Sequence, residues 1–208
     1  MNVAAFKKFP LMGILRGITP ESLEPLIETI VAGGLRTIEI TMNTGGAPEL
    51  IEKAVKFSKG RLVLGAGTVL NREGLRMALD HGATFVVTPV LVRDVVSECV
   101  KKKIPVFPGA LTPLEIYNAW EAGATMVKVF PVKFFGPEYL QEIKAPLQSI
   151  ELLACAGVTP GNLRAYLDHG ASAVAFGSEV FRKAWLKKKD YASIGNAIER
   201  FVKAFLRP

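Results

Sequence analysis

The feature that most constrains the fold is a segment that occurs four times along the chain. Each copy has a glycine, a few mostly small or polar residues, and then a run of β-forming residues. The four copies span Ala32–Met42, Asp80–Pro89, Glu121–Pro131 and Asp168–Ser178. A glycine in that place suits the position just after a helix, where a left-handed backbone favours a residue without Cβ. The pattern therefore predicts four helix ends, each followed by a strand.

The spacing of the four glycines indicates how much structure lies between them. Gly34, Gly82, Gly123 and Gly170 are separated by 48, 41 and 47 residues. One strand and one helix need only about half of such a period, so each period is expected to hold two strand–helix units. Four further strands are predicted in the intervals, over Leu11–Arg16, Arg61–Gly67, Ile104–Ala110 and Glu151–Gly157.

Eight strands that alternate with helices predict an α/β protein with a (β/α)8 TIM barrel. Three helices are expected to begin at Thr-Pro pairs, at Thr19, Thr112 and Thr159, because threonine caps a helix and proline suits its first turn. The alternative is an open doubly wound sheet, which predicts a glycine-rich dinucleotide turn after the first strand. Leu15–Ser22 has no such turn. We expect a single barrel domain over residues 1–208, with a short N-terminal helix.

Composition excludes several classes of protein. Half of the residues are hydrophobic, and the mean hydropathy is +0.28, so a large core is available. No apolar run reaches the roughly 18 residues of a membrane helix, and the first residues lack the apolar segment and cleavage site of a signal peptide. Two cysteines make no disulfide framework. We therefore expect a cytoplasmic protein without a membrane partner.

The net charge of +7 favours an anionic partner. Two lysine triplets, Lys101–Lys103 and Lys187–Lys189, contribute to it, but aromatic residues are not interleaved with them as they are on a nucleic-acid surface. A small anionic substrate, attracted by the field of the protein, is the better match, and no nucleic-acid partner is expected. A non-catalytic, anion-binding barrel remains the alternative outside the enzyme class.

Lys128 is the residue that most directly suggests chemistry. It interrupts the apolar run Met126–Phe130, and a buried ammonium is costly without a partner. Side chains alternate between the two faces of a strand, so if Val127 and Val129 contact the helices, Lys128 points into the barrel. The other explanation is a strand edge from which the lysine reaches water.

Glu39 is expected to face Lys128 across the barrel. Ile38 and Ile40 suit the helix side of their strand, which turns Glu39 inward. The two residues lie on the second and sixth of eight predicted strands, and small side chains at Ala173 and Ala175 leave room between them. The alternative role is a structural buried ion pair, although such pairs give little net stability.

A lysine and a glutamate in a roomy barrel suit imine chemistry. Burial among apolar side chains disfavours the charged form of an amine, and a neutral amine attacks a carbonyl. Glu39 is then placed to move protons on the substrate. Lys133 is a rival lysine, but it follows Pro131 and is expected in a loop.

A metal route has little support in the sequence. Only two histidines are present, His81 and His169, and each directly precedes one of the repeated glycines. That position is the end of a helix before a strand, at the face of a barrel away from the active site. We expect neither a metal nor a cofactor.

The ends of the strands carry groups that suit an anion. Gly157, Gly177 and Ser178 follow the seventh and eighth predicted strands, where many barrels bind phosphate through backbone N–H groups. Arg16 ends the first strand and offers a bidentate partner for a carboxylate or phosphate. Its alternative role is a salt bridge that closes the top of the barrel.

Several motifs together resemble the 2-keto-3-deoxy-6-phosphogluconate / 4-hydroxy-2-oxoglutarate aldolase family. They run in order along nearly the whole chain: Glu39–Thr41, Gly65–Leu70, Val87–Pro89, Pro108-Gly109 and Val127–Pro131. Three stretches are more similar to the branch that cleaves 2-dehydro-3-deoxy-6-phosphogalactonate: Ile14–Ser22, Glu39–Asn43 and Phe135–Leu140.

The resemblance implies a class I aldolase on a (β/α)8 barrel, commonly a homotrimer. It would cleave a 2-keto-3-deoxy-6-phospho sugar acid, of galactonate or gluconate type, to pyruvate and glyceraldehyde 3-phosphate. Lys128 matches the Schiff-base lysine and Glu39 the general acid/base. The resemblance places the other contacts at Arg16 and Thr68 near the substrate carboxylate, Gly157, Gly177 and Ser178 near the phosphate, Pro89 and Phe130 as apolar walls, and Cys155 beside the aldehyde.

Two departures from the family pattern bear on the substrate. Cys155-Ala156-Gly157 stands where the family usually has Thr-Gly-Gly or Val-Gly-Gly, and the methyl group of Ala156 is expected to forbid a positive φ there and to weaken phosphate binding. Asn43 replaces an arginine of the phosphogluconate branch, which favours the galactonate side. The alternatives are an aldolase for a non-phosphorylated 2-keto-4-hydroxy acid, such as 4-hydroxy-2-oxoglutarate, and an imine-free sugar-phosphate isomerase with Glu39 as base and Lys128 as an electrostatic clamp.

Overall fold

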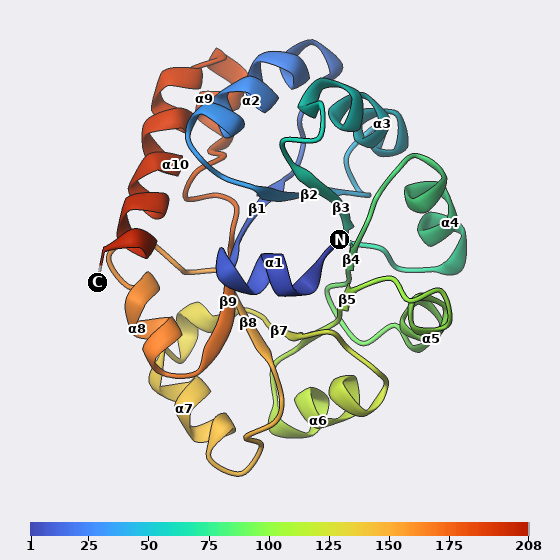
Figure 1. Cartoon of the computed structure of the whole chain (residues 1–208), viewed down its shortest axis with the longest axis vertical. Coiled ribbons are helices and arrows are strands. Elements are labelled where there is room, and N and C mark those ends of the chain that lie inside the picture. Colours follow the sequence, from blue (N-terminus) through green and yellow to red (C-terminus); the bar gives the residue numbers. More distant parts are fainter. Residues whose placement is uncertain (208) are drawn as a thin grey trace.

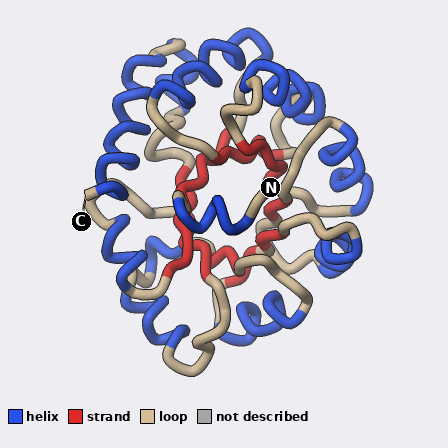
Figure 2. The backbone as a smooth tube through the Cα atoms, viewed as in Figure 1, coloured by secondary structure: helices blue, strands red, loops and turns tan. Residues whose placement is uncertain are grey.

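The computed structural model describes residues 1–207 and shows a ring of parallel strands inside a layer of helices (Figure 1). Figure 2 shows the same arrangement, with the strands as a nearly closed ring. Within residues 1–207 the sheet has nine strands in the order β5-β4-β3-β2-β1-β9-β8-β7-β6, and every strand pairs in parallel with its neighbours. The predicted (β/α)8 barrel is confirmed.

The strands are short and fall inside the predicted segments. Their bounds are β1 Leu11–Leu15, β2 Thr37–Thr41, β3 Val63–Gly67, β4 Val86–Val87, β5 Val106–Phe107, β6 Gly109–Ala110, β7 Val127–Val129, β8 Leu152–Cys155 and β9 Ala171–Phe176. The helices on the outside are α2 Pro20–Ala32, α3 Ala47–Ser58, α4 Arg72–Asp80, α5 Arg93–Lys101, α6 Pro113–Glu121, α7 Glu138–Lys144, α8 Leu163–Asp168, α9 Lys183–Lys188 and α10 Tyr191–Leu206, with a 3-10 turn η1 over Val132–Phe134. The short helix α1, Val3–Lys8, lies across one end of the ring instead.

Proline explains why the ring counts nine strands where eight were predicted. The fifth predicted strand is broken at Pro108 into β5, which pairs with β4, and β6, which pairs with β7. Proline has no N–H to give to a ladder. Its carbonyl still accepts a hydrogen bond from the Lys128 N–H at 2.8 Å, so the two pieces act as one interrupted strand of an eight-membered barrel.

The glycines and threonines at the helix ends largely behave as predicted. Gly34, Gly82, Gly123 and Gly170 all adopt left-handed backbone geometry, with φ between +86° and +99°. Thr19 caps α2 and Thr112 caps α6. The predicted start at Thr159 is wrong, because residues 159–162 form a turn held by the Asn162 side chain, which accepts a hydrogen bond from the Thr159 N–H at 2.7 Å. Helix α8 therefore begins only at Leu163.

Helix α1 closes one end of the barrel, as Figure 1 shows. The Met1 ammonium donates to the carbonyl of Thr84 at 3.1 Å, and Lys7 pairs with Glu151 at 2.8 Å. Thr84 and Glu151 precede β4 and β8, so α1 covers the amino ends of the strands. The carboxyl ends, where barrel enzymes place their active sites, stay uncovered by it.

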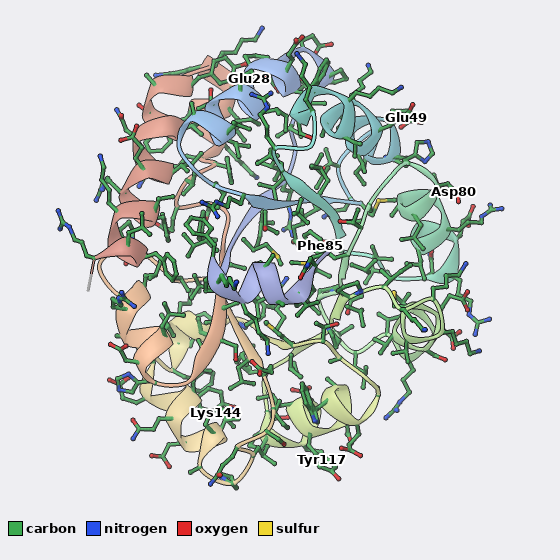
Figure 3. The ribbon with its side chains drawn as sticks, in the orientation of Figure 1. Glu28, Glu49, Asp80, Phe85, Tyr117 and Lys144 are labelled. Atoms are coloured by element: carbon green, nitrogen blue, oxygen red, sulfur yellow. The ribbon has the colours of Figure 1, made fainter. Side chains whose placement is uncertain are left out.

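Aromatic side chains fill the barrel interior beneath α1. The ring of Phe6 packs edge-on against Phe107, with centroids 6.0 Å apart, and Phe107 packs edge-on against Phe85 at 5.8 Å. Phe85 lies beside α1 within the ring of strands (Figure 3). This inner cluster is separate from the larger core between the strands and the helices.

In residues 1–207 no helix has both the length and the apolar character needed to cross a lipid bilayer.

Candidate active site

Lys128 and Glu39 both point into the barrel interior. Val127 and Val129 pack into the core between strands and helices, and Lys128 between them is only 8% exposed. Ile38 belongs to the same outer core, whereas Glu39 beside it is 1% exposed. The alternation predicted for β2 and β7 is thus confirmed.

The two charged groups are neighbours but not an ion pair. No contact within 4.0 Å joins the Lys128 ammonium to the Glu39 carboxylate, and the buried Glu39 Oε2 has no hydrogen-bond partner among residues 1–207. Burial raises the pKa of Glu39 above its usual value, while the positive charges of Lys128 and Arg16 act in the opposite direction. A buried carboxyl with a free oxygen is a group that can exchange a proton with a bound molecule.

Small residues make the space around Glu39. A Cβ at Gly67 of β3 would lie 2.4 Å from Glu39 Oε1 and 2.7 Å from its Cδ. The carboxylate therefore occupies the volume that any side chain at residue 67 would fill. Ala173 and Ala175 of β9 line the same interior, as predicted, and add little bulk.

Arg16 lies at the rim of this space, at the carboxyl end of β1. Its guanidinium is exposed, and Nη2 lies 3.5 Å from Oγ1 of Thr68. In residues 1–207 no carboxylate lies within 4.0 Å of Arg16, so the alternative of a salt bridge closing the barrel is not supported. Thr68 has φ +58°, which is unusual for a β-branched residue and indicates backbone strain beside the site.

Cys155 and Ala156 lie at the end of β8, which β9 separates from β1 in the ring of strands. The Cys155 thiol is 2% exposed, and burial raises its pKa, partly offset by the charge of Lys128. The expectation that Ala156 forbids a positive φ is wrong, because the residue has φ +66°. Its carbonyl accepts a hydrogen bond from the Lys133 N–H at 3.0 Å, a contact that helps to hold this strained geometry.

The loops at the ends of β8 and β9 come close to the neighbouring backbone. A Cβ at Gly157 would lie 2.3 Å from the Cβ of Lys133, and one at Gly177 would lie 3.3 Å from the Cβ of Ile14. Ser178 next to Gly177 is exposed. Close packing therefore leaves no room for a side chain at Gly157, whereas at Gly177 the fit is tight but less severe.

Of the two predicted apolar walls, Phe130 lies next to Lys128. Phe130 follows β7 and is 39% exposed, with its ring centre 5.2 Å from Lys128 Nζ. Pro89, two residues after β4, is half-buried. The rival Lys133 is exposed and its ammonium lies 4.8 Å from the ring centre of Phe134, so it is not part of the interior.

The two histidines lie at helix ends, as predicted. His81 caps α4 and His169 caps α8, and Nδ1 of each lies 2.7 Å from the carbonyl four residues earlier. No group of three or more His, Cys, Asp or Glu side chains in residues 1–207 is arranged to hold a metal ion.

One buried contact at the mouth was not predicted. Thr44 Oγ1 accepts a hydrogen bond from the Gly17 N–H at 3.0 Å and lies 3.1 Å from Thr41 Oγ1. Gly17 and Thr44 are 27 residues apart, and no local pattern signals such a contact. A groove of about 400 Å³ borders this turn and includes Thr68 in its wall; the prediction missed it also.

Comparison with known proteins shows which proteins this chain resembles. The family model "Aldolase: KDPG and KHG aldolase" matches residues 3–197. The 2-dehydro-3-deoxy-6-phosphogalactonate aldolase of Escherichia coli (strain K12) is 36% identical over 176 residues, which cover 84% of this chain and 86% of that protein. The 2-dehydro-3-deoxy-phosphogluconate aldolase of Treponema pallidum (strain Nichols) is 32% identical over 171 residues, covering 80% and 81%. A solved structure described as "Native KDPGal structure" superposes with a TM-score of 0.87 at 33% identity and covers 94% of each chain.

Proposed function

The chain belongs to the KDPG and KHG aldolase family, and we propose that it is a class I aldolase acting on 2-keto-3-deoxy-6-phospho sugar acids, with the galactonate type preferred. The products are pyruvate and glyceraldehyde 3-phosphate. The observation that carries the proposal is the pair in the barrel interior: Lys128 and Glu39 are buried, lie on opposite strands, and are not joined by an ion pair. A merely structural pair would be in contact, because contact is what offsets the cost of burying two charges.

The first half of the reaction forms a covalent link to the substrate. Lys128 Nζ attacks the C2 carbonyl, a C–N bond forms, and the carbonyl oxygen leaves as water to give a protonated imine. Glu39 takes the proton of the C4 hydroxyl. The C3–C4 bond then breaks, its electron pair flows toward the imine nitrogen, and the aldehyde product leaves an enamine on Lys128.

The second half regenerates the enzyme. Glu39 gives its proton to C3 of the enamine, and water hydrolyses the resulting imine to release pyruvate and the free amine. The raised pKa of Glu39 suits both of its tasks, because a carboxyl that titrates closer to neutral pH is a better proton donor than an ordinary one and still accepts protons. General acid/base help of this kind contributes about 10²–10⁴-fold.

The remaining site residues are proposed to hold the two ends of the substrate. Arg16 is exposed at the rim and has no carboxylate partner among residues 1–207, so its guanidinium suits the substrate carboxylate, with Thr68 beside it. Gly157, Gly177 and Ser178 follow the ends of β8 and β9, and their backbone N–H groups are proposed to bind the phosphate. Phe130 and Pro89 supply apolar walls, and Cys155 faces the interior near the aldehyde end.

Pyruvate release from five candidate substrates tests this assignment. The two C4 epimers of 2-keto-3-deoxyhexonate, galacto and gluco, are assayed with and without the 6-phosphate, alongside 4-hydroxy-2-oxoglutarate. We expect the phosphorylated galacto epimer to give the highest kcat/KM. A higher value for a non-phosphorylated compound would replace the sugar-phosphate assignment with the alternative substrate class, and no pyruvate from any of them would refute an aldolase.

The organisation of the active enzyme is also a proposal. We propose that residues 1–208 work as one barrel domain, that the protein assembles as a homotrimer, and that it acts in the cytoplasm. The family resemblance supports the single barrel and the trimer, and two cysteines without a disulfide framework support the cytoplasm. Light scattering on the purified protein tests the assembly, and a mass equal to one chain of 22.5 kDa would contradict the trimer.

A further inference from the structure

Two loops at the carboxyl ends of neighbouring strands are tied together at one buried point. Gly17 follows Arg16 at the end of β1, and its N–H donates to Thr44 Oγ1 at 3.0 Å. Thr44 is 5% exposed and lies in the loop between β2 and α3. This hydroxyl therefore joins the strand that carries Arg16 to the strand that carries Glu39.

The Thr44 hydroxyl is itself held in place. Its oxygen lies 3.1 Å from that of Thr41, which is completely buried at the end of β2. The Thr44 N–H donates to the Thr41 carbonyl at 2.9 Å, and the Thr44 carbonyl accepts from the Ala47 N–H at 3.1 Å. The side chain thus projects from a turn with fixed backbone, so it can determine where Gly17 lies.

Gly17 is a point at which the backbone needs such support. It has φ +66°, and an added Cβ would meet no atom within 4 Å. Packing of neighbouring atoms around Gly17 therefore does not fix its conformation. The contact between Arg16 Nη2 and Thr68 Oγ1 is long, at 3.5 Å, and gives the exposed guanidinium little support of its own. The Gly17 N–H belongs to the peptide bond that follows Arg16, so a different backbone conformation at Gly17 would shift the backbone from which the guanidinium extends.

We propose that Thr44 is a positioning residue, which sets the place of Arg16 by holding the Gly17 N–H and thereby sets the affinity for the carboxylate of the substrate. The inference rests on the proposed function, in which Lys128 forms an imine with a 2-keto acid. Thr44 itself does not contact the reacting atoms in this account.

The chain offers a matched control at the other end of the barrel. Thr125 precedes β7, and its Oγ1 accepts a hydrogen bond from the N–H of Val106 at 3.0 Å, across 19 residues. Thr125→Val and Thr44→Val therefore delete the same kind of contact, and both leave a backbone donor without its partner. Of the two threonines, only Thr44 contacts the residue next to Arg16.

The test measures how much pyruvate half-saturates adduct formation on Lys128. Pyruvate is titrated in the presence of borohydride, which reduces the imine to a stable amine, and the adduct is quantified by mass spectrometry. For Thr44→Val we expect the half-saturating concentration to rise by about tenfold, with the trapping rate at saturation within a few fold of wild type. Thr44→Ser keeps the acceptor and Thr125→Val leaves the mouth intact, so both are expected to match wild type.

The same substitution in the Arg16→Ala variant shows whether Thr44 acts through Arg16 or disturbs the site in another way. Because Thr44 acts through Arg16, the double variant Arg16→Ala/Thr44→Val is expected to need no more pyruvate than Arg16→Ala alone. Unchanged half-saturation in Thr44→Val, or a further tenfold loss in the Arg16→Ala background, would overturn the inference. If Thr44→Val does not fold, Thr44→Ala makes the same deletion without the extra methyl and carries the same expectation.

Adduct formation in the wild-type protein tests the proposed function separately from the role of Thr44. A wild-type adduct together with an unaffected Thr44 variant would refute only the role of Thr44. No adduct in the wild-type protein would refute the proposed function, and this inference with it.

Discussion

The two ends of the barrel interior are built from the same strands but have opposite character. At the amino end, Phe6, Phe85 and Phe107 fill the space, and α1 covers it. At the carboxyl end, Lys128 and Glu39 are buried near a glycine and small side chains. Side chains of one strand face recur every two residues, so at β3 and β7 a step of two residues leads from one end to the other.

Strand β3 shows the difference most clearly, through two glycines that face the interior. A Cβ at Gly65 would lie 2.4–2.5 Å from atoms of the Phe85 ring, and a Cβ at Gly67 would lie 2.4 Å from Glu39 Oε1. The first glycine makes room for a ring that completes the packing. The second makes room for a carboxylate that is left without a full set of partners. Packing at the filled end stabilises the fold, whereas burial of charged groups at the polar end lowers the stability.

The largest effect is expected at strand β7, from Lys128→Ala compared with Met126→Ala just before the strand. Loss of the amine removes the covalent step, so kcat/KM for the phosphorylated sugar acid should fall about 10⁴-fold or more. Met126 is fully buried at the filled end, and its truncation should lower the free energy of unfolding by about 2–5 kcal/mol while the folded enzyme keeps its activity. Steady-state kinetics and chemical denaturation measure the two quantities. Comparable turnover in both variants would remove the distinction between the ends.

Glu39→Gln should have the next largest effect. An amide cannot accept the C4 proton, so turnover should fall about 10²–10⁴-fold, while pyruvate still forms an imine that borohydride traps. The measurement compares kcat for cleavage with the yield of trapped adduct in the same preparation. Undiminished kcat would contradict the role of Glu39 as the proton carrier.

The paired glycine variants sharpen the comparison within one strand. Gly67→Ala should displace the Glu39 carboxylate and lower kcat by up to about 10²-fold, with a small change in stability because the end of that side chain can move. Gly65→Ala should crowd the rigid Phe85 ring and lower the free energy of unfolding by about 1–3 kcal/mol, with the activity of the folded protein retained. A loss of activity in Gly65→Ala together with a loss of stability in Gly67→Ala would contradict the distinction between the two ends.

The smallest effect is a pH dependence of stability that belongs to Glu39. Its pKa is raised in the folded protein by burial, so below its ordinary value of 4.5 the carboxyl is protonated in both states and imposes no penalty. As the pH rises from there through the raised pKa, the unfolded chain releases the proton more readily, and the folded state loses stability. Glutamine has no such proton, so Glu39→Gln should become more stable than wild type toward neutral pH.

Denaturation of both proteins across this range measures the difference. A wild-type protein that gains stability relative to Glu39→Gln as the pH rises would contradict a raised pKa for Glu39.

Much of this contrast was predictable from sequence because it follows from strand periodicity. The inward positions of Glu39, Lys128, Ala173 and Ala175 follow once the neighbouring valines and isoleucines are assigned to the helix side. The spacing of the glycines that precede the strands indicated the number of strand–helix units. Burial of a charged residue in an apolar run was the signal that marked the polar end.

The missed features depend on contacts between segments that are far apart in the chain. The hydrogen bond between Gly17 and Thr44 and the tight fit of Gly67 against Glu39 involve different strands and leave no local pattern. Ala156 was wrongly expected to avoid a positive φ, because propensity describes an isolated residue, whereas the carbonyl of Ala156 is held by the Lys133 N–H. The break at Pro108 followed from proline chemistry and was overlooked.

The most direct test of the account is the location of the imine. Wild-type protein is incubated with pyruvate and borohydride, digested, and mapped by mass spectrometry, with Lys128→Ala treated in parallel. The account predicts one pyruvate-derived adduct, on Lys128, and none in the variant. An adduct on the exposed Lys133, an equal yield in Lys128→Ala, or no adduct in the wild-type protein would contradict it.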